Sequence, residues 1–296
     1  MNPDHLKELC PRIEALEAMP ADPGIVQTLT TMLQLPPDQV DMTKVVELVA
    51  YDGTITAHCL RMANSPRFGR RNTETIRGAV LALGLERVEA ILMGYCPDRI
   101  VPAERSTFDA LTFWRHSLGC ALVSRKLAKL IGYRDCEKAY LAGLLHDLGV
   151  LVNMLVCTEE FRQCIQAARE ARVALRQIEE QRLGFTHCES GKLLAEHWKF
   201  SADVLAVIEH HHDVAAAPSA HGLVSLIHLS DLLCRLRGLG YGYYEGMGID
   251  LAADPAWATL EEECPALRRI DLMRITMDID GAMYEIVDVV NAIFRP

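Results

Sequence analysis

The stretch that decides the fold reads Ala139-Tyr140-Leu141-Ala142-Gly143-Leu144-Leu145-His146-Asp147-Leu148-Gly149-Val150. It is apolar except for the His-Asp pair, and an unpaired charge in such surroundings would be costly. His146 and Asp147 therefore need a partner inside the protein. A divalent metal ion meets that need, because it neutralises the aspartate and uses the lone pairs of neutral histidine.

Helical periodicity continues on both sides of this stretch, and no segment reads as a confident alternating strand. The sequence therefore predicts an all-α fold, a multi-helix bundle with an N-terminal helical subdomain. Helices are expected over residues 23–35, 41–49, 54–63, 75–83, 85–94, 107–131, 136–155, 159–172, 174–183, 188–199, 202–211, 222–237 and 275–294. Asp41 or Thr43 is the expected cap of the second helix, and Ser201 that of the helix starting at Ala202.

Periodicity is lost over Pro97-Asp98-Arg99-Ile100-Val101-Pro102, which is the best internal boundary. We expect an N-terminal helical part over residues 1–100 and a helical core with the candidate metal site over residues 101–240. A loop-rich passage and a C-terminal helix then occupy residues 241–296.

Composition and charge exclude several classes of protein. The chain has 296 residues, of which 50% are apolar, so it can bury a sizeable core. Its net charge of -10 argues against a general nucleic-acid binder and against a binder of anionic membranes. The one tight basic group, Arg67, Arg70 and Arg71, is interpreted as a solvated loop rather than a phosphate clamp.

Two further features indicate the cytoplasm. The ten cysteines are spread along the chain without a CxxC pair or a signal peptide, which indicates reduced thiols. The most apolar segment, residues 139–157, is interrupted by polar residues, so it lacks the uninterrupted run of about 20 apolar residues that a membrane span requires.

Five imidazoles and two carboxylates form the candidate metal site: His116, His146, Asp147, His187, His211, His212 and Asp231. These ligand types suit iron, manganese or zinc better than calcium, and we expect iron or manganese ahead of zinc. His228 lies three residues before Asp231, where it either orients a ligand or packs between helices. The remaining histidines, His5, His58, His197 and His221, are assigned to the surface or to packing.

The order of these residues resembles the ligand pattern of the HD superfamily of metal-dependent phosphohydrolases. By that resemblance, a first metal would be held by His116, His146, Asp147 and Asp231. A second would be held by His187, His211 and His212, with Asp147 as the bridge. Two ions about 3.5–4 Å apart can together activate a water and bind a phosphoryl oxygen.

A second series of motifs runs through the chain. It comprises residues 16–33, residues 46–57, Leu60-Arg61-Met62-Ala63-Asn64-Ser65, residues 76–88, Phe113-Trp114-Arg115-His116-Ser117, Ala142-Gly143-Leu144-Leu145-His146-Asp147-Leu148-Gly149 and His187-Cys188-Glu189-Ser190-Gly191. Over about residues 12–235 the series resembles the HDOD domain, the HD-related output domain of bacterial signalling proteins. The resemblance implies an all-helical regulatory module with a protein partner in a signalling pathway. Many HDOD proteins are thought to have lost metal ligands, whereas this sequence keeps all seven.

Two departures from the catalytic relatives bear on turnover. Val150 stands where catalytic HD proteins often have a lysine after the His-Asp-x-Gly turn. The Gly-Tyr-Pro signature of the cyclic di-GMP phosphodiesterases is replaced by Asp213-Val214-Ala215-Ala216-Ala217-Pro218, and Tyr241-Gly242-Tyr243 is interpreted as loop.

The leading hypothesis is a cytoplasmic regulatory HDOD protein with a mono- or dinuclear metal site, acting as response-regulator output through protein contacts. The alternative is a two-metal phosphodiesterase or phosphohydrolase that acts on a nucleotide-type substrate. An oxygen-using or redox-sensing diiron protein and a scaffold with an empty pocket stay open as further classes. A nucleotide ligand and a homodimer also remain open, whereas nucleic acid and a membrane are not expected as partners.

Overall fold

The computed structural model describes residues 3–16, 19–36, 38–65, 73–93, 110–241, 250–269 and 272–294. Within these ranges every regular element is a helix, which confirms the all-α prediction. The helices are α1 Pro3–Glu14, α2 Pro23–Leu33, α3 Met42–Tyr51, α4 Gly53–Ala63, α5 Ile76–Leu83, α6 Leu85–Met93, α7 Ala110–Ile131, α8 Cys136–Leu145, α9 Leu148–Val156, α10 Thr158–Ala171, α11 Leu175–Arg182, α12 His187–His197, α13 Ala202–His210, η4 Val214–Ala216, α14 His221–Leu236, η5 Leu251–Ala253, α15 Ala256–Glu263, η6 Pro265–Arg269 and α16 Leu272–Ile293.

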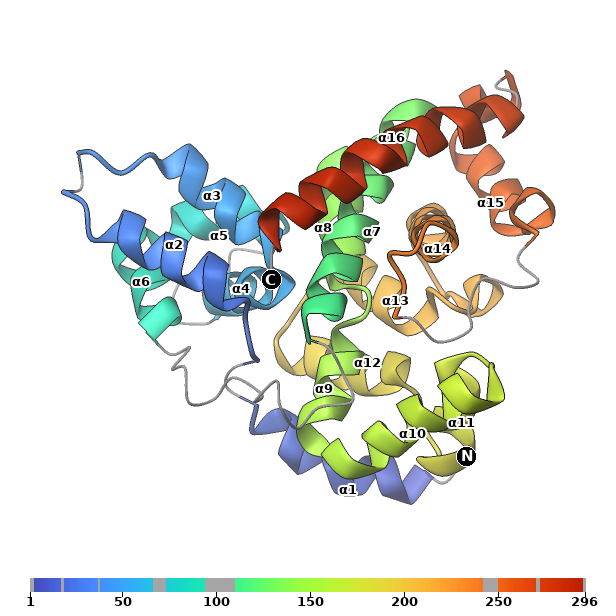
Figure 1. Ribbon diagram of the computed structural model, residues 1–296, viewed down its shortest axis with the longest axis horizontal. Coiled ribbons are helices and arrows are strands. Elements are labelled where there is room, and N and C mark those ends of the chain that lie inside the picture. Colours follow the sequence, from blue (N-terminus) through green and yellow to red (C-terminus); the bar gives the residue numbers. More distant parts are fainter. Residues whose placement is uncertain are drawn as a thin grey trace.

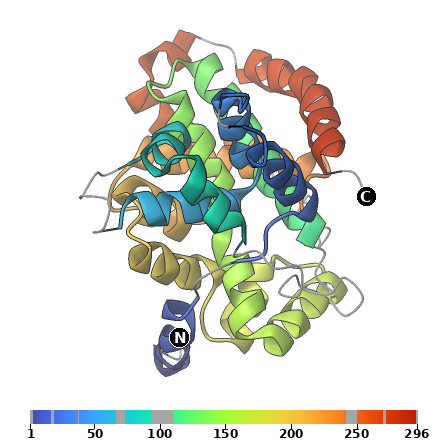
Figure 2. The same cartoon turned by 90° about the vertical axis from the view of Figure 1, so that its left-hand side faces the viewer.

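The molecule has two parts. Helices α2 to α6 form an N-terminal lobe, on the left of Figure 1, and α7 to α14 form a central bundle. Helix α16 packs along α7 on one side of the bundle, and α1 packs against α9 and α12 at the opposite end (Figures 1 and 2). The chain therefore starts on the bundle, builds the lobe, and returns.

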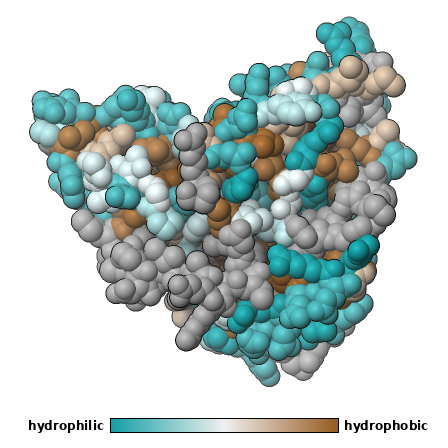
Figure 3. Space-filling view, viewed as in Figure 1, coloured by the Kyte–Doolittle hydropathy of each residue, from teal (hydrophilic) through white to brown (hydrophobic). Residues whose placement is uncertain are grey.

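The face in Figure 3 has a notch between the lobe and the bundle, and the surface over α10 and α11 at lower right is polar. Helix α10 buries one apolar face, with Phe161, Cys164 and Ile165 inward and acidic residues in its first turn. Single-sided burial of this kind is typical of a helix on the outside of a bundle.

Carboxylate caps start three helices of the lobe. Asp41 accepts hydrogen bonds from the backbone of Thr43 and Lys44, which settles the choice of cap for α3 in favour of the aspartate. Asp22 accepts from Ile25 N at 2.9 Å, and the proline at position 23 takes the first turn, where no amide hydrogen is needed. Each cap satisfies amide groups that a helix start leaves unpaired.

The lobe is anchored on α8, the helix that leads to His146. The hydroxyl of Tyr140 donates to the carbonyl oxygen of Ala50 at 2.8 Å. A Cβ atom on Gly53 would lie 2.9 Å from the carbonyl oxygen of Leu144, so the start of α4 approaches α8 at backbone distance. This contact fixes the lobe against the centre of the bundle.

The expected single helix over residues 136–155 is wrong in one respect, because the chain breaks at His146-Asp147. Helix α8 ends at Leu145 and α9 begins at Leu148, with Asp147 at φ -102° and ψ 17°. Both polar side chains are buried inside the bundle at this break. The stretch Cys136–Val156 is long and apolar enough to cross a membrane, but 94% of its apolar 18-residue window is buried inside the protein.

Other boundaries differ by a few residues, and two helices were not expected. These are helix α1 at the start of the chain and helix α15 in the passage that was expected to be loop-rich. Both are short amphipathic helices that are stabilised by packing against the core. Ser201 stands at the cap position of α13, but its side chain makes no capping hydrogen bond. The internal boundary at 97–102 and the basic group Arg67, Arg70 and Arg71 lie outside the described residues.

Candidate metal centre

All seven candidate ligands meet at the centre of the bundle. His116 comes from α7, His146 and Asp147 from the break between α8 and α9, and His187 from the first turn of α12. His211 and His212 follow α13, and Asp231 comes from α14. His212 has 16% of its side chain exposed, and the other six are buried.

Glycines allow the approach of these helices. A Cβ atom on Gly149 of α9 would overlap the carbonyl oxygen of His187. A Cβ atom on Gly191 of α12 would lie 3.1 Å from the Cα atom of Gly149. On α8, a Cβ atom at Gly143 would lie 3.0 Å from the Cα atom of Ala121. Close backbone contact therefore sets the positions of His187 and His146 relative to Asp147.

The first half-site is formed by His116, His146 and Asp231 together with the Oδ2 atom of Asp147. The Nε2 atom of His116 lies 3.3 Å from His146 Nε2, 3.3 Å from Asp231 Oδ1 and 3.4 Å from Asp147 Oδ2. His146 Nε2 lies 3.3 Å from Asp147 Oδ2. Ligands bonded to one ion at about 2.0–2.1 Å in a tetrahedron are about 3.3–3.4 Å apart, so these separations fit a single ion.

The second half-site is formed by His187, His211 and His212 together with the Oδ1 atom of Asp147. His211 Nε2 lies 3.2 Å from Asp147 Oδ1, and His187 Nε2 lies 3.5 Å from the same oxygen. The Nε2 atoms of His187 and His212 are 3.2 Å apart. Asp147 thus faces the first half-site with one oxygen and the second with the other.

Four of the five imidazoles are oriented by a partner at Nδ1. His116 Nδ1 pairs with the carbonyl oxygen of Leu239 at 2.6 Å, and His146 Nδ1 with that of Gly143 at 2.8 Å. His211 Nδ1 pairs with the carbonyl oxygens of Val207 and Ile208, both at 3.1 Å. A carbonyl oxygen only accepts, so Nδ1 carries the hydrogen and the neutral ring presents its Nε2 lone pair to the centre.

His187 is oriented by a carboxylate. Its Nδ1 donates to Glu179 Oε2 at 2.7 Å, and Glu179 is in turn held by Asn153 Nδ2 at 3.1 Å. Glu179 is fully buried. A carboxylate behind the imidazole fixes the tautomer and strengthens the donor atom, as in many metal sites.

The donor set fits a metal ion by a direct test. Within the described part of the chain, the buried Asp147 Oδ1 and His211 Nε2 atoms make no regular hydrogen bond. They face each other at 3.2 Å, lone pair toward lone pair in the neutral tautomer. A cation between the two atoms removes the repulsion and satisfies both.

The pKa shifts of the cluster are also compatible with a metal site. Burial disfavours the charged imidazole of His146, but Asp147 and Cys120 together outweigh burial and raise its pKa to about 10. Burial also acts against the charge of Asp147, yet His146 and the other imidazoles hold the pKa of that carboxyl well below its usual range. The carboxylates stay charged, and protons held by the imidazoles must leave when a metal binds.

Three residues at the centre were missed at the sequence level: Glu179, Arg235 and Tyr241. Arg235 donates through Nε to Asp231 Oδ1 at 2.8 Å, and its second terminal nitrogen, Nη2, pairs with Asp231 Oδ2 at 2.5 Å. The hydroxyl of Tyr241 donates to Asp147 Oδ2 at 2.8 Å. Of the three, only Arg235 could have been assigned to the site from the sequence, because it lies four residues after Asp231 on one helix.

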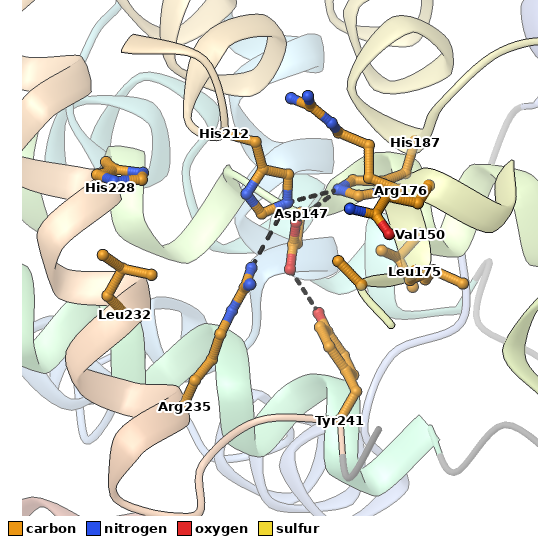
Figure 4. A pocket seen from close by; sticks show the side chains of 12 residues that line it. Asp147, Val150, Leu175, Arg176, His187, His212, His228, Leu232, Arg235 and Tyr241 are labelled. Atoms are coloured by element: carbon orange, nitrogen blue, oxygen red, sulfur yellow. Dashed lines mark hydrogen bonds and ion pairs between the residues drawn. The ribbon is translucent and has the colours of Figure 1, made fainter. Parts of the chain in front are cut away.

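A cavity of about 260 Å³ opens onto the second half-site. Figure 4 shows Asp147, His187 and His212 at its base, with Arg235 rising from α14 toward His212 and Tyr241 pointing to Asp147. Val150 and Leu175 form an apolar wall, and Arg176 extends on the far side of the imidazoles.

The remaining histidines were assigned to orientation, packing or the surface. His228 does contact the site indirectly, because its Nδ1 atom lies 2.7 Å from the carbonyl oxygen of His211. His58 is buried against the edge of Trp198, at 4.9 Å between ring centres, and His197 and His221 are exposed. The side chain of His5 lies outside the described residues.

A family model of the HDOD domain matches residues 19–214 of this chain. The chain belongs to the HDOD family. The HDOD match contains six of the seven candidate ligands, whereas Asp231 lies beyond its end, as do Arg235 and Tyr241.

Two solved structures share the fold. An HDOD domain protein of unknown function from Geobacter sulfurreducens is 27% identical, with a TM-score of 0.64 over 99% of each chain. The MmoQ response regulator from Methylococcus capsulatus str. Bath has 20% identity and a TM-score of 0.64, covering 86% of this chain and 98% of that one. At that identity the second match shows the fold alone.

A curated protein from Treponema pallidum (strain Nichols), itself uncharacterised, is 25% identical over 200 residues. The match covers 66% of this chain but 38% of that relative. The chain therefore spans well under half the length of the curated protein that it matches.

Proposed function

We propose that this HDOD protein is a cytoplasmic regulatory module with a mono- or dinuclear divalent metal site, iron or manganese ahead of zinc, and that it acts through contacts with a protein partner. The ligands would be His116, His146, Asp147, His187, His211, His212 and Asp231. One observation carries the metal: Asp147 Oδ1 and His211 Nε2, both buried and, among the described residues, without a hydrogen bond, face each other at 3.2 Å.

Two features favour a regulatory role over turnover. Val150 is buried in the wall of the cavity, at the position where catalytic relatives often carry a lysine, and it offers no charge to a phosphoryl group. Arg235 is paired with Asp231 through both carboxylate oxygens, so its charge is committed to a candidate ligand. The family membership and the fold shared with a response regulator support the same role.

Metal analysis combined with an activity panel tests this proposal. Protein purified without chelator is expected to contain about one or two iron or manganese ions per chain, and chelation is expected to lower its melting temperature, because metal binds the folded state. A panel of cyclic dinucleotides, nucleotides and phosphomonoesters is expected to show no turnover above Asp147→Ala protein. Steady hydrolysis that disappears in Asp147→Ala would overturn the regulatory role, and metal-free protein with a chelator-insensitive melting curve would overturn the metal.

The cavity supports a second candidate, a metal-dependent phosphohydrolase acting on a nucleotide-type substrate. A bound divalent ion would supply Lewis-acid activation of a phosphoryl group there. Around it, Arg176 and Gln177 line the cavity wall where an anionic ligand would lie, and Tyr241 holds Asp147 through its hydroxyl. Substrate-dependent phosphate release that falls in both Asp147→Ala and Arg176→Ala would favour this candidate, and release unaffected by either change would exclude it.

A further inference from the structure

Cys188 is the one buried thiol in the described ranges that the apolar core does not account for. It is the second residue of α12, directly after His187, and 5% of its surface is exposed. Every other buried cysteine of the described residues packs in the apolar core, whereas Cys188 is not part of it. Packing against apolar neighbours therefore does not explain why a thiol is buried here.

The donor atoms around Cys188 offer a different reason. Its sulfur and one nitrogen each of His187, His211 and His212 all lie within 4.8 Å of one another. These imidazoles are the candidate nitrogen ligands of the second half-site. Sulfur and nitrogen atoms bonded to one ion at about 2.3 Å and 2.0–2.1 Å in a tetrahedron are about 3.5–3.6 Å apart. The thiol is therefore close to the place that a further ligand of the same ion would take.

We infer that Cys188 is a sulfur ligand of the second half-site and that it makes this half-site prefer zinc or iron to manganese. The inference rests on the proposed function, since it concerns the same metal centre. It goes beyond that proposal by adding a ligand of different chemistry and by narrowing the metals that one half-site takes.

Two unpaired atoms point to a cation in this half-site independently of the cysteine. Within the described part of the chain, His211 Nε2 and Asp147 Oδ1 are buried without a hydrogen bond and lie 3.2 Å apart. The first half-site has a separate donor group, formed by His116, His146 and Asp231. Cys188 thus belongs to the half-site that contains the unpaired atoms.

The charge of the second half-site leaves room for a negative ligand. Its other candidate ligands among the described residues are three imidazoles and one oxygen of the shared Asp147. When a thiol binds a metal ion, its proton leaves to the solvent and a sulfur–metal bond replaces the S–H bond, so the sulfur contributes a negative charge. The first turn of α12 favours that charge, because the amides at a helix start carry partial positive charge.

The sulfur also affects which metal is preferred. Thiolate and imidazole ligands suit zinc and iron, whereas manganese prefers carboxylate, carbonyl and water oxygens. The first half-site has two carboxylates, Asp147 and Asp231, beside its imidazoles and has no thiol in its donor group among the described residues. We therefore expect the two half-sites to differ in metal preference.

Cobalt substitution reports directly on a sulfur ligand. The full chain is freed of metal with chelator, loaded with Co²⁺ under anaerobic conditions and separated from excess metal by gel filtration. Wild type is expected to show the near-ultraviolet charge-transfer band of a cobalt–thiolate bond, which nitrogen and oxygen ligands do not give. Cys188→Ala and Cys188→Ser are both expected to lose this band.

Cys120→Ala is the matched control. Cys120 is buried and interacts with His146 at the first half-site, but it belongs to the apolar core. In the described part of the chain it is also absent from the groups of donor atoms that could share an ion. The cobalt–thiolate band is therefore expected to be unchanged in Cys120→Ala.

Two histidine variants locate the sulfur. The donor group of Cys188 includes His212 but not His116. We expect His212→Ala to lose or strongly weaken the cobalt–thiolate band and His116→Ala to keep it. The opposite result would place the thiol at the first half-site and overturn the inference.

Competition with a chelator measures the metal preference. Loss of a partner behind a metal ligand typically weakens binding about 10–100-fold, so loss of a direct ligand is expected to weaken Zn²⁺ in the second half-site at least about tenfold. Mn²⁺ is expected to weaken much less in the same Cys188→Ala protein. An equal loss for both ions would overturn the preference.

The outcomes separate this inference from the proposed function. Cobalt-loaded wild type without the thiolate band would overturn the inference and leave the metal proposal intact, and this measurement needs no variant to fold. A band that survives in folded Cys188→Ser, or that is lost in folded Cys120→Ala instead, would also overturn the inference. Wild type that binds no metal would overturn both.

Discussion

Two buried aspartates, one in each part of the molecule, are accommodated in opposite ways. Asp52 in the lobe accepts hydrogen bonds from the amides of Asp22, Thr54 and Ile55 and from the Thr54 hydroxyl, at 2.6–3.0 Å. Asp147 in the bundle accepts a hydroxyl from Tyr241 and otherwise faces imidazole nitrogens at 3.2–3.5 Å. Both side chains are nearly inaccessible.

The difference teaches where each part obtains its stability. The partners of Asp52 are mostly its own sequence neighbours, so the lobe is complete once its helices form. The partners of Asp147 come from four distant segments and leave lone pairs facing one another. We therefore expect the bundle to reach its full stability only with a bound cation, and the variants below test this contrast.

The largest effect is expected where the bundle is assembled. Gly149→Ala places a Cβ atom on the carbonyl oxygen of His187 at the crossing of α9 and α12, where backbone and not a flexible side chain must move. We expect a loss of more than about 4 kcal/mol in the free energy of unfolding, measured by urea titration. Gly281→Ala in α16 is the control, with nothing near the added atom, and should gain up to about 1 kcal/mol. If Gly149→Ala and Gly281→Ala changed the free energy of unfolding equally, the crossing of α9 and α12 would not be tightly packed.

Removing the bridging carboxylate is expected to have the next largest effect. Asp147→Ala should lose its metal and with it the stabilisation by mass action, about 4 kcal/mol when free metal exceeds its dissociation constant a thousandfold. Thermal melts with metal and with chelator should then coincide for the variant and differ for wild type. Persistence of a metal-dependent shift in Asp147→Ala would break the contrast between the two aspartates.

On the lobe side, Asp52→Ala leaves three buried amides without their acceptor. We expect a loss of about 3–4 kcal/mol that is the same with and without metal. Asp41→Ala removes an exposed cap and should cost about 1 kcal/mol. A change in metal content on replacing Asp52 would show that the two parts are not independent.

An effect smaller than that of Asp52, and dependent on pH, concerns His58 at the junction of lobe and bundle. Burial, and to a lesser extent Arg61, lowers its pKa to about 4. The unfolded chain binds this proton below about pH 6.5 and the folded chain does not, so stability is complete above that pH and falls as the pH drops toward 4. We expect the loss to be about 1–3 kcal/mol and to be reduced in His58→Phe. Parallel pH profiles for the two proteins would exclude this role.

The sequence predicted what local chemistry determines. The cap at Asp41 and the His146-Asp147 pair were recognisable because the reason for each lies in its sequence neighbours, whereas the other five candidate ligands were predicted from the order of the residue types and its resemblance to the HD superfamily. Glu179 and Tyr241 were not, because each reaches the site only through the tertiary fold. The break at Asp147 was hidden by the continuous apolar run on both sides of it.

The contact between Gly149 and Gly191 has a mechanical consequence. Backbone meets backbone where Gly149 of α9 contacts Gly191 of α12, so no side-chain rotation at this contact can absorb a displacement of one helix relative to the other. Helix α1 packs against both of these helices. We therefore expect a displacement of α1 to move α9 and α12 together, with Asp147 and His187 kept at their separation.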